Sequence, residues 1–310
     1  MKIAFIFPGQ GSQSVGMMNS FAQLPSVRDT FSEASDAIGK NVWKLVEEGP
    51  ADELNLTTNT QPAMLAAGVA LFRAWNAENG IEPAICAGHS LGEYSALVAA
   101  GAIGFADAMV LVHFRAQAMQ EAVPAGDGAM AAILGLDDDV VRAACEEAEG
   151  IGEVVEAANF NSPAQVVIAG NRAAVQRAME IAKGKGAKRA VLLPMSVPSH
   201  CSLMRPAAEL LRQRLLAAKI AVARVPVLHN ADVQSAGSAD SIRDALVRQL
   251  YQPVRWVDTV RAIVSAGATR LVECGPGKVL TGLNKRIAPE TPTFSFADKP
   301  AFKEALAALK

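Results

Sequence analysis

Short apolar runs that end in glycine or proline recur along the chain. Residues 2–9 (KIAFIFPG), 84–88 (AICAG) and 270–277 (RLVECGPG) all show this pattern. Runs with continuous rather than alternating hydrophobicity are typical of strands that are covered on both faces. Because each run leads into a helical pattern, the sequence predicts a parallel sheet in an α/β domain. Residues 225–230 (VPVLHN) are expected to form a further strand.

The middle of the chain has a different order of elements. The pattern predicts a strand at 129–134, a helix at 137–149, strands at 154–158 and 165–169, a helix at 172–183 and a strand at 189–193. This β-α-β-β-α-β order is that of a ferredoxin-like unit. Residues 126–128 and 194–198 look like the two crossings between domains. We therefore expect a small domain at 126–196, inserted into a large α/β domain made of residues 1–125 and 197–310, with a ligand cleft between them.

Composition narrows the classes of function. The chain has 310 residues, of which 51% are hydrophobic, so it can bury a substantial core. Its 29 Lys and Arg residues are balanced by 31 Asp and Glu residues, and no net basic field favours nucleic acid or an anionic membrane. Only five apolar residues follow Lys2 before Pro8, too few for a signal peptide or a membrane span. The four cysteines lie far apart, which predicts neither a zinc site nor a disulfide framework.

Residues 88–92 (GHSLG) carry the clearest chemical signal. Gly-x-Ser-x-Gly between a strand and a helix predicts a sharp, strained turn that exposes the serine. Ser90 would project into the cleft at a helix N-terminus, and the amide of Leu91 would face a developing oxyanion. The five-residue pattern is common by chance. The strand before it and the helix after it favour a nucleophile over a serine in an ordinary turn.

A serine nucleophile needs a base, and the chain has four histidines. His89 is adjacent to Ser90, and the turn should carry it away, so a structural role is expected. His113 lies in a helical stretch, where packing is at least as good an explanation, while His229 ends an expected strand and stays open as a candidate. His200, in a proline-fixed loop at the re-entry into the large domain, is the best candidate by position.

Further features of the sequence bear on this site. Cys201, next to His200, offers a thiol as an alternative nucleophile, but no strained turn surrounds it. No Asp or Glu identifies itself as the partner of His200, and a backbone carbonyl could accept from the imidazole equally well. The glycine-rich stretches FPGQGSQ and GPGKVL lack the spacing of nucleotide-binding loops. The first of them could supply a second oxyanion amide, from Gln10.

Seven stretches together carry a resemblance to a known family. They are FPGQGSQ, GHSLGEYSAL, HFRAQAMQ, NFNSPAQVVIAG, VPSH, RQLYQPVRW and GPGKVLTGL. In this order, and over nearly the whole chain, they resemble the malonyl-CoA:acyl carrier protein transacylases of fatty acid synthesis. The resemblance implies an α/β-hydrolase-like domain with a parallel sheet, interrupted by a ferredoxin-like subdomain. This agrees with the organisation expected from the pattern of the chain.

The resemblance also implies roles for individual residues. Ser90 would be the nucleophile, and His200 its base. Gln249 would orient His200 through its main-chain carbonyl, which would explain the missing carboxylate. Gln10 and Leu91 would donate the amides of the oxyanion hole.

Arg115 would pair with the free carboxylate of the malonyl group, because a guanidinium binds a planar carboxylate through two charge-assisted hydrogen bonds. The family usually has glycine after this arginine, whereas this chain has Ala116, which affects local packing more than charge. The implied partners are malonyl-CoA and acyl carrier protein, with coenzyme A thioester as substrate and no metal or bound prosthetic group. We expect a cytoplasmic monomer that binds neither nucleic acid nor membrane.

Alternative functions stay open at this point. The same serine chemistry would suit an esterase or thioesterase, and a malonyl transferase could serve polyketide or malonate metabolism. A catalytically silent acyl-CoA-binding module is a further alternative. Because carrier proteins are acidic as a class, a basic surface near the cleft mouth is expected, formed either by Lys278, Lys285 and Arg286 or by residues 183–189.

Overall fold

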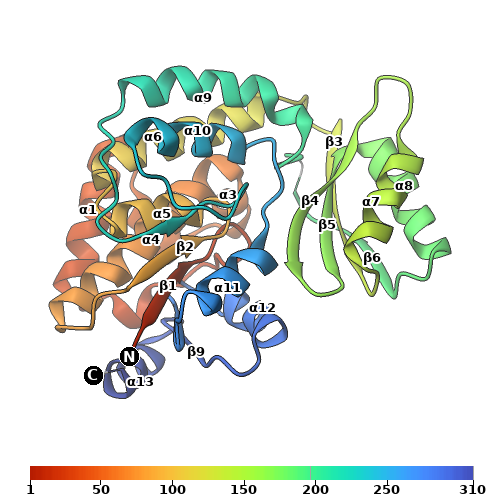
Figure 1. Ribbon diagram of the computed structural model, residues 1–310. Helices are drawn as coiled ribbons and strands as arrows, with labels where there is room; N and C mark the ends of the chain where they lie inside the picture. The colour runs from red at the N-terminus through yellow and green to blue at the C-terminus, as the bar shows by residue number, and fades with distance from the viewer. Residues whose placement is uncertain (196, 310) are drawn as a thin grey trace.

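The computed structural model describes residues 1–195 and 197–309. Figure 1 shows a large part, which holds both chain ends, and a smaller part beside it. In the described residues the strands are β1 (Ile3–Phe7), β2 (Ile85–Gly88), β3 (Gly128–Leu134), β4 (Val155–Ser162), β5 (Gln165–Asn171), β6 (Arg189–Leu192), β7 (Val227–Leu228), β8 (Arg270–Glu273) and β9 (Thr293–Ser295). The α-helices are α1 (Pro25–Ile38), α2 (Val42–Glu48), α3 (Ala51–Asn55), α4 (Thr57–Ala77), α5 (Gly92–Ala99), α6 (Phe105–Glu121), α7 (Asp138–Ala148), α8 (Arg172–Gly184), α9 (Arg205–Ala217), α10 (Ala239–Gln249), α11 (Trp256–Ser265), α12 (Val279–Ile287) and α13 (Lys299–Ala308). Short 3-10 helices are η1 (Asn19–Phe21) and η2 (Ser202–Met204).

The large part is built on a parallel sheet with the strand order β7-β2-β1-β8-β9. The central strand β1 is buried on both faces. Ile3, Phe5 and Phe7 belong to a hydrophobic cluster that includes α1, α4, α5 and α6, whereas Ala4 and Ile6 pack in a cluster with α11 and α12. The continuous apolar runs therefore predicted the parallel sheet correctly. Among the described helices, none has an apolar stretch long enough to cross a membrane.

The strand expected at 225–230 is shorter than predicted, since β7 covers only Val227 and Leu228. The backbone amides that follow bond outside the sheet. His229 N donates to Gln234 O (3.0 Å), and Asn230 N donates to Glu93 Oε2 (2.9 Å). The strand ends at this point because these donors are used by a turn and by a helix side chain.

The small part contains an antiparallel sheet with the order β4-β5-β3-β6, packed against α7 and α8. This confirms the β-α-β-β-α-β order expected from the sequence. β4 runs further than predicted, to Ser162, and its register against β5 shifts twice. Its edge pairs with the loop before α11, where Phe160 N donates to Val254 O and Val254 N donates to Ala158 O (both 2.9 Å). The domain boundary expected at residue 196 lies outside the described residues and stays a prediction.

The turn from β2 into α5 depends on two glycines. A Cβ atom at Gly88 would lie 1.9 Å from the carbonyl carbon of Gly92, and a Cβ at Gly92 would lie 2.0 Å from Phe7 O. Both distances are far shorter than a van der Waals contact. Only glycine therefore allows α5 to begin so close to the ends of β1 and β2, which places Ser90 at the carboxyl edge of the sheet.

The substitution Gly92→Ala should lower the free energy of unfolding by about 1–3 kcal/mol or more, because the added methyl meets backbone that cannot move aside. Urea unfolding measures this change. Gly282→Ala, in α12, is the control: nothing lies within 4 Å of its added Cβ. It should leave the stability unchanged or raise it by up to about 1 kcal/mol through helix propensity. Equal losses in the two variants would contradict the steric argument.

Candidate active site

Ser90 and His200 lie within hydrogen-bond distance, although they are 110 residues apart in the chain. Ser90 occupies the turn between β2 and α5, and His200 the loop that leads into η2. The distance from His200 Nε2 to Ser90 Oγ is 2.7 Å. Both residues have positive φ, 51° for Ser90 and 64° for His200, a region that side-chain-bearing residues rarely adopt. Such backbone strain costs about 1–3 kcal/mol per residue and is concentrated at functional sites.

The main chain of Gln249 holds the imidazole in place. His200 Nδ1 lies 2.7 Å from Gln249 O, at the end of α10, and His200 N donates to Leu250 O (2.9 Å). Because a carbonyl only accepts, Nδ1 carries the proton and Nε2 presents a lone pair to the Ser90 hydroxyl. The site thus orients its histidine without a carboxylate in contact with the ring.

The surroundings of His200 keep it in its neutral form. Burial lowers the pKa of its imidazole to about 3, and the nearby Arg115 cation acts in the same direction. A neutral imidazole can accept a proton from serine at physiological pH. The ring is therefore available as a proton acceptor, while its lowered pKa limits its basicity.

Arg115, on α6, is buried beside the serine with 1% of its surface exposed. Its Nη1 donates to Gln61 Oε1 (2.6 Å), and its Nη2 donates to Gln249 Oε1 (2.9 Å) and Ser90 Oγ (3.3 Å). Within residues 1–195 and 197–309, the ion pairs do not include this guanidinium. A buried cation held only by neutral acceptors favours an incoming anion.

Two residues whose backbone amides are free among the described residues line the same space. Gln10 follows β1 and Leu91 begins the turn into α5, and both residues line the cavity that contains Ser90. Neither N–H takes part in a hydrogen bond within the part of the chain that the structure describes. The loops lie against each other, since a Cβ at Gly9 would lie 2.4 Å from His89 O. The geometry suits an oxyanion hole, in which free amides point at the position where negative charge develops.

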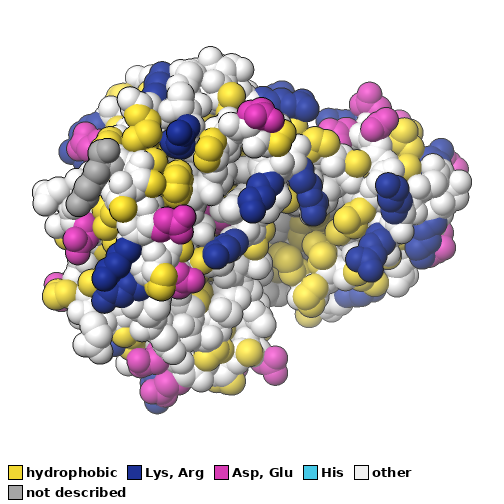
Figure 2. All heavy atoms as spheres, turned by 90° about the horizontal axis from the view of Figure 1, so that it is seen from below, with side chains coloured by type: hydrophobic (Ala, Val, Ile, Leu, Met, Phe, Trp, Pro, Cys, Tyr) yellow, Lys and Arg dark blue, Asp and Glu magenta, His cyan; other side chains and the backbone are white. Residues whose placement is uncertain are grey.

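The cavity lies between the two parts of the molecule and has a volume of about 130 Å³. The small part contributes wall residues, which are Met130, Asn159, Asn161, Val167, Leu193 and Met195. Figure 2 shows the hollow between the large and small parts, with hydrophobic side chains on its wall and Lys and Arg side chains beside it. Sequence reasoning missed these wall residues, although Asn159, Asn161 and Val167 fall within the NFNSPAQVVIAG stretch.

The other histidines and Cys201 use their polar atoms elsewhere. His89 Nε2 bonds Asn161 Oδ1 (2.8 Å), His113 Nε2 lies near Gln117 Nε2 (3.4 Å), and His229 Nδ1 bonds Glu93 Oε1 (2.7 Å). His89 and His229 therefore have structural contacts. The buried Cys201 donates to Pro198 O (3.1 Å), and burial raises the pKa of its thiol to about 12. A thiol that stays protonated is a poor nucleophile, which argues against the Cys201 alternative.

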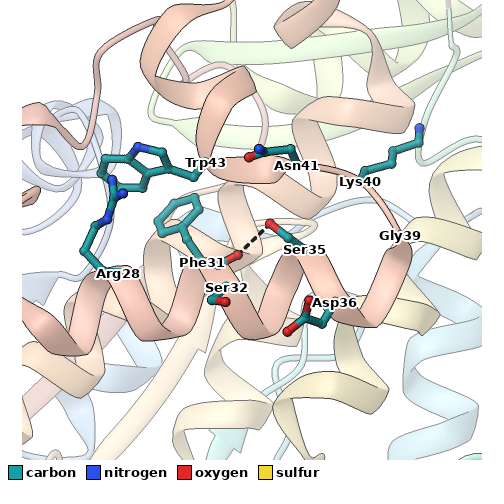
Figure 3. A pocket seen from close by; sticks show the side chains of 9 residues that line it. All are labelled: Arg28, Phe31, Ser32, Ser35, Asp36, Gly39, Lys40, Asn41 and Trp43. Carbon is teal, nitrogen blue, oxygen red and sulfur yellow. Dashed lines mark hydrogen bonds between the residues drawn. The ribbon is translucent and has the colours of Figure 1, made fainter.

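A wider hollow of about 560 Å³ lies between α1 and α2, lined by residues that include Arg28, Phe31 and Trp43 (Figure 3). Two of its polar side chains are engaged in the local fold. Ser35 Oγ donates to Phe31 O (2.7 Å), and Asn41 Oδ1 caps α2 by accepting from Lys44 N (2.9 Å). The hollow is a groove in the helical layer, and nothing in it resembles the chemistry around Ser90.

The comparisons with known proteins agree with this geometry. A model of the acyl transferase domain family matches residues 4–289. The malonyl CoA-acyl carrier protein transacylase of Escherichia coli strain K12 is 56% identical over 301 residues, which are 97% of each chain. The crystal structure of an acyl-carrier-protein S-malonyltransferase from Burkholderia pseudomallei is 58% identical with a TM-score of 0.97, covering 99% of this chain and 100% of that one. A malonyl-transacylase in complex with its type II PKS acyl-carrier protein is 50% identical with a TM-score of 0.98, again covering 99% and 100%.

The parallel sheet, its nucleophile elbow and the paired histidine define a serine-type acyltransferase, and the chain belongs to the acyl transferase domain family. More narrowly, it belongs to the malonyl CoA-acyl carrier protein transacylases, whose curated members match it over almost its full length. The family resemblance seen in the sequence is thereby confirmed. The six predicted site residues lie around one cavity or in direct contact with the residues that do, as described above.

Acylation of Ser90 by a neutral activated ester, such as p-nitrophenyl acetate, should keep a constant rate from about pH 8 down to about pH 5, because His200 remains unprotonated. A histidine of ordinary pKa would slow the reaction about 30-fold at pH 5. In Arg115→Met the loss of the cation raises the pKa of His200, so the acid limb should move to higher pH. Stopped-flow measurements extended from about pH 8 down to about pH 3 test both. A wild-type acid limb near the ordinary histidine pKa would contradict the argument.

Proposed function

We propose that this chain, as a malonyl CoA-acyl carrier protein transacylase, moves the malonyl group of malonyl-CoA to the phosphopantetheine thiol of acyl carrier protein for fatty acid biosynthesis. The transfer passes through a malonyl ester on Ser90. The observation that carries the proposal is the Ser90–His200 contact beside a buried, carboxylate-free Arg115. The names of the relatives over nearly the full chain support the same reaction.

In the first half-reaction His200 Nε2 accepts the proton of the Ser90 hydroxyl as Oγ attacks the thioester carbonyl. A C–O bond forms, and the amides of Gln10 and Leu91 stabilise the oxyanion; loss of one such donor typically costs about 100- to 1000-fold in rate. The tetrahedral intermediate then breaks its C–S bond. The proton on His200 passes to the departing coenzyme A thiolate, which leaves malonate esterified to Ser90.

The second half-reaction reverses these steps with a different thiol. The phosphopantetheine thiol of the carrier enters the cavity, gives its proton to His200 and attacks the ester carbonyl. The C–S bond forms, the C–O bond breaks, and Ser90 recovers its proton from His200. This is a ping-pong transfer, in which the enzyme alternates between free and acylated forms.

Arg115 accounts for the choice of acyl group. Its guanidinium can exchange the contact with Ser90 Oγ for two hydrogen bonds to the malonyl carboxylate, while Gln61 and Gln249 hold it in place. An acetyl group offers no such partner and leaves the buried cation unpaired. The site therefore favours malonyl over acetyl thioesters.

The acidic carrier should approach over α12, which contacts the small part. Lys278, Lys285 and Arg286 are exposed there, and Arg286 Nη1 donates to Gln165 Oε1 of the small part (2.8 Å). Residues 183–189 lie instead between α8 and β6 of the small part (Figure 1). We favour Lys278, Lys285 and Arg286 as the docking group, because Arg286 of α12 also contacts the small part. The cytoplasmic location and the monomeric state stay predictions.

Incubation with labelled malonyl-CoA in the absence of carrier should leave label on Ser90, because the cavity between the two parts limits access of water to the ester. Mass spectrometry of the intact protein measures the adduct. Ser90→Ala should show no adduct and no transfer. Rapid release of free malonate without a trapped ester would instead support the thioesterase alternative, and full transfer by Ser90→Ala would refute the covalent scheme.

Arg115→Ala should lower kcat/KM for malonyl-CoA by about 150- to 5000-fold, because truncating one partner of a buried charge pair costs about 3–5 kcal/mol. The rate with acetyl-CoA should change much less, so the preference between the two should shift towards acetyl. Arg73→Ala, which removes a half-exposed arginine paired with Glu33, is the control and should leave the preference unchanged. An unchanged preference in Arg115→Ala would show that this residue does not bind the malonyl carboxylate.

A further inference from the structure

Glu93 lies one turn after Ser90 on α5 and is fully buried. Its carboxylate accepts three hydrogen bonds: Oε1 from His229 Nδ1 (2.7 Å), and Oε2 from Asn230 N (2.9 Å) and Gln249 Nε2 (3.0 Å). The residue is absent from the lining of the cavity in the part of the chain that the structure describes. Any effect of Glu93 on the site must therefore pass through other residues.

The side chain of Gln249 connects Glu93 to the substrate-binding cation. Its Nε2 donates both to Glu93 Oε2 and to Ser90 O (2.8 Å), and its Oε1 accepts from Arg115 Nη2 (2.9 Å). An amide has one donating and one accepting end, so its orientation is decided by its neighbours. Glu93 only accepts and Arg115 only donates. The two together permit one orientation of the Gln249 amide, with the oxygen towards Arg115.

Asn230 gives Glu93 a second connection to the nucleophile. Asn230 N donates to Glu93, its Oδ1 accepts from Ser90 N (2.7 Å), and its Nδ2 donates to Gly88 O (2.6 Å). The strained turn that contains Ser90 is thus held by Asn230 and Gln249, both of which bond the same carboxylate oxygen. That oxygen thus bonds the backbone N–H of Asn230 and the side-chain amide of Gln249.

We propose that Glu93 is a positioning residue for malonyl selectivity, which fixes the Gln249 amide so that its oxygen holds Arg115 in the direction of the acyl group. The proposal rests on the proposed function. This role requires a side chain long enough to place an acceptor oxygen beside Gln249, more than it requires negative charge. Asp in place of Glu93 keeps the charge but withdraws the carboxylate by one methylene, whereas Gln keeps the reach and an acceptor oxygen but loses the charge.

The test compares kcat/KM for malonyl-CoA and acetyl-CoA in wild type, Glu93→Asp and Glu93→Gln. Glu93→Asp should lower the malonyl-to-acetyl ratio by about 10- to 100-fold, the effect expected when a hydrogen bond involving a charged group is lost. Glu93→Gln should stay within about threefold of wild type, since its amide oxygen can accept from Asn230 and Gln249 while its NH2 faces His229 in the other tautomer. Equal ratios in wild type and Glu93→Asp would overturn the proposal, as would a ratio changed only in Glu93→Gln.

Glu273→Asp is the matched control for damage to the fold. Glu273 is also a fully buried carboxylate with three hydrogen bonds, which it accepts from Leu280 N (2.9 Å), Thr281 N (2.7 Å) and Thr281 Oγ1 (2.6 Å) at the start of α12. Shortening it should lower the melting temperature and leave the malonyl-to-acetyl ratio unchanged. A ratio that falls equally in Glu273→Asp would show that the effect is general destabilisation, against the proposal.

Gln249→Met provides a second route if Glu93→Asp does not fold. It keeps the main-chain carbonyl that bonds His200 and removes the side-chain amide, so the ratio should fall as in Glu93→Asp. An unchanged ratio would overturn the proposal. Wild-type transfer of malonyl to acyl carrier protein is measured in the same assay. Its absence would refute the proposed function itself, whereas normal wild-type transfer with unchanged variant ratios refutes only the role of Glu93.

Discussion

The hydrogen bond between the imidazole of His200 and the hydroxyl of Ser90 is the contact on which the site depends. It joins two residues that both have strained backbone and that the whole small part separates in the chain. Neither loop could hold such a conformation alone. The turn at Ser90 is fixed by glycine contacts against β1, and the loop at His200 is fixed by bonds to the end of α10. The parallel sheet and its helices supply the rigidity that keeps the two atoms together.

Around this contact the interior holds several polar groups, whose burial is costly unless each finds a partner. Gln249 contributes most to meeting this requirement, since its carbonyl bonds the histidine, its amide nitrogen bonds the elbow and its amide oxygen bonds Arg115. The guanidinium of Arg115 is only partly compensated, because its hydrogen-bond partners are all neutral. The free enzyme bears that desolvation cost, and in the proposed reaction the substrate carboxylate would relieve it. On this proposal, selectivity for a charged acyl group would follow from an incompletely compensated charge.

Much of the architecture could be predicted from local pattern, because burial on both faces leaves continuous apolar runs and amphipathic helices leave periodic ones. β1, β2 and β8 were recognised in this way, as were the elements of the small part. The ends of β4 and β7 were not, because they are decided by distant bonds to Val254 and Glu93. In the site, the elbow motif marked Ser90 directly, and the family resemblance supplied Arg115 and Gln249. Gln61 and Asn230 carried no local signal, since a polar residue in an apolar stretch does not reveal which partner it has.

The partner of the catalytic histidine has a consequence for the energetics of the whole cycle. A carbonyl fixes the tautomer of the ring as a carboxylate would, but it provides no negative charge to stabilise an imidazolium, and Arg115 opposes one. In the proposed mechanism a protonated His200 would thus be short-lived and would return its proton readily to a departing sulfur. Since the two thioesters exchanged are chemically alike, nothing in the protein drives the transfer one way. The relative amounts of the two thiols and their acylated forms then set the direction of net flux.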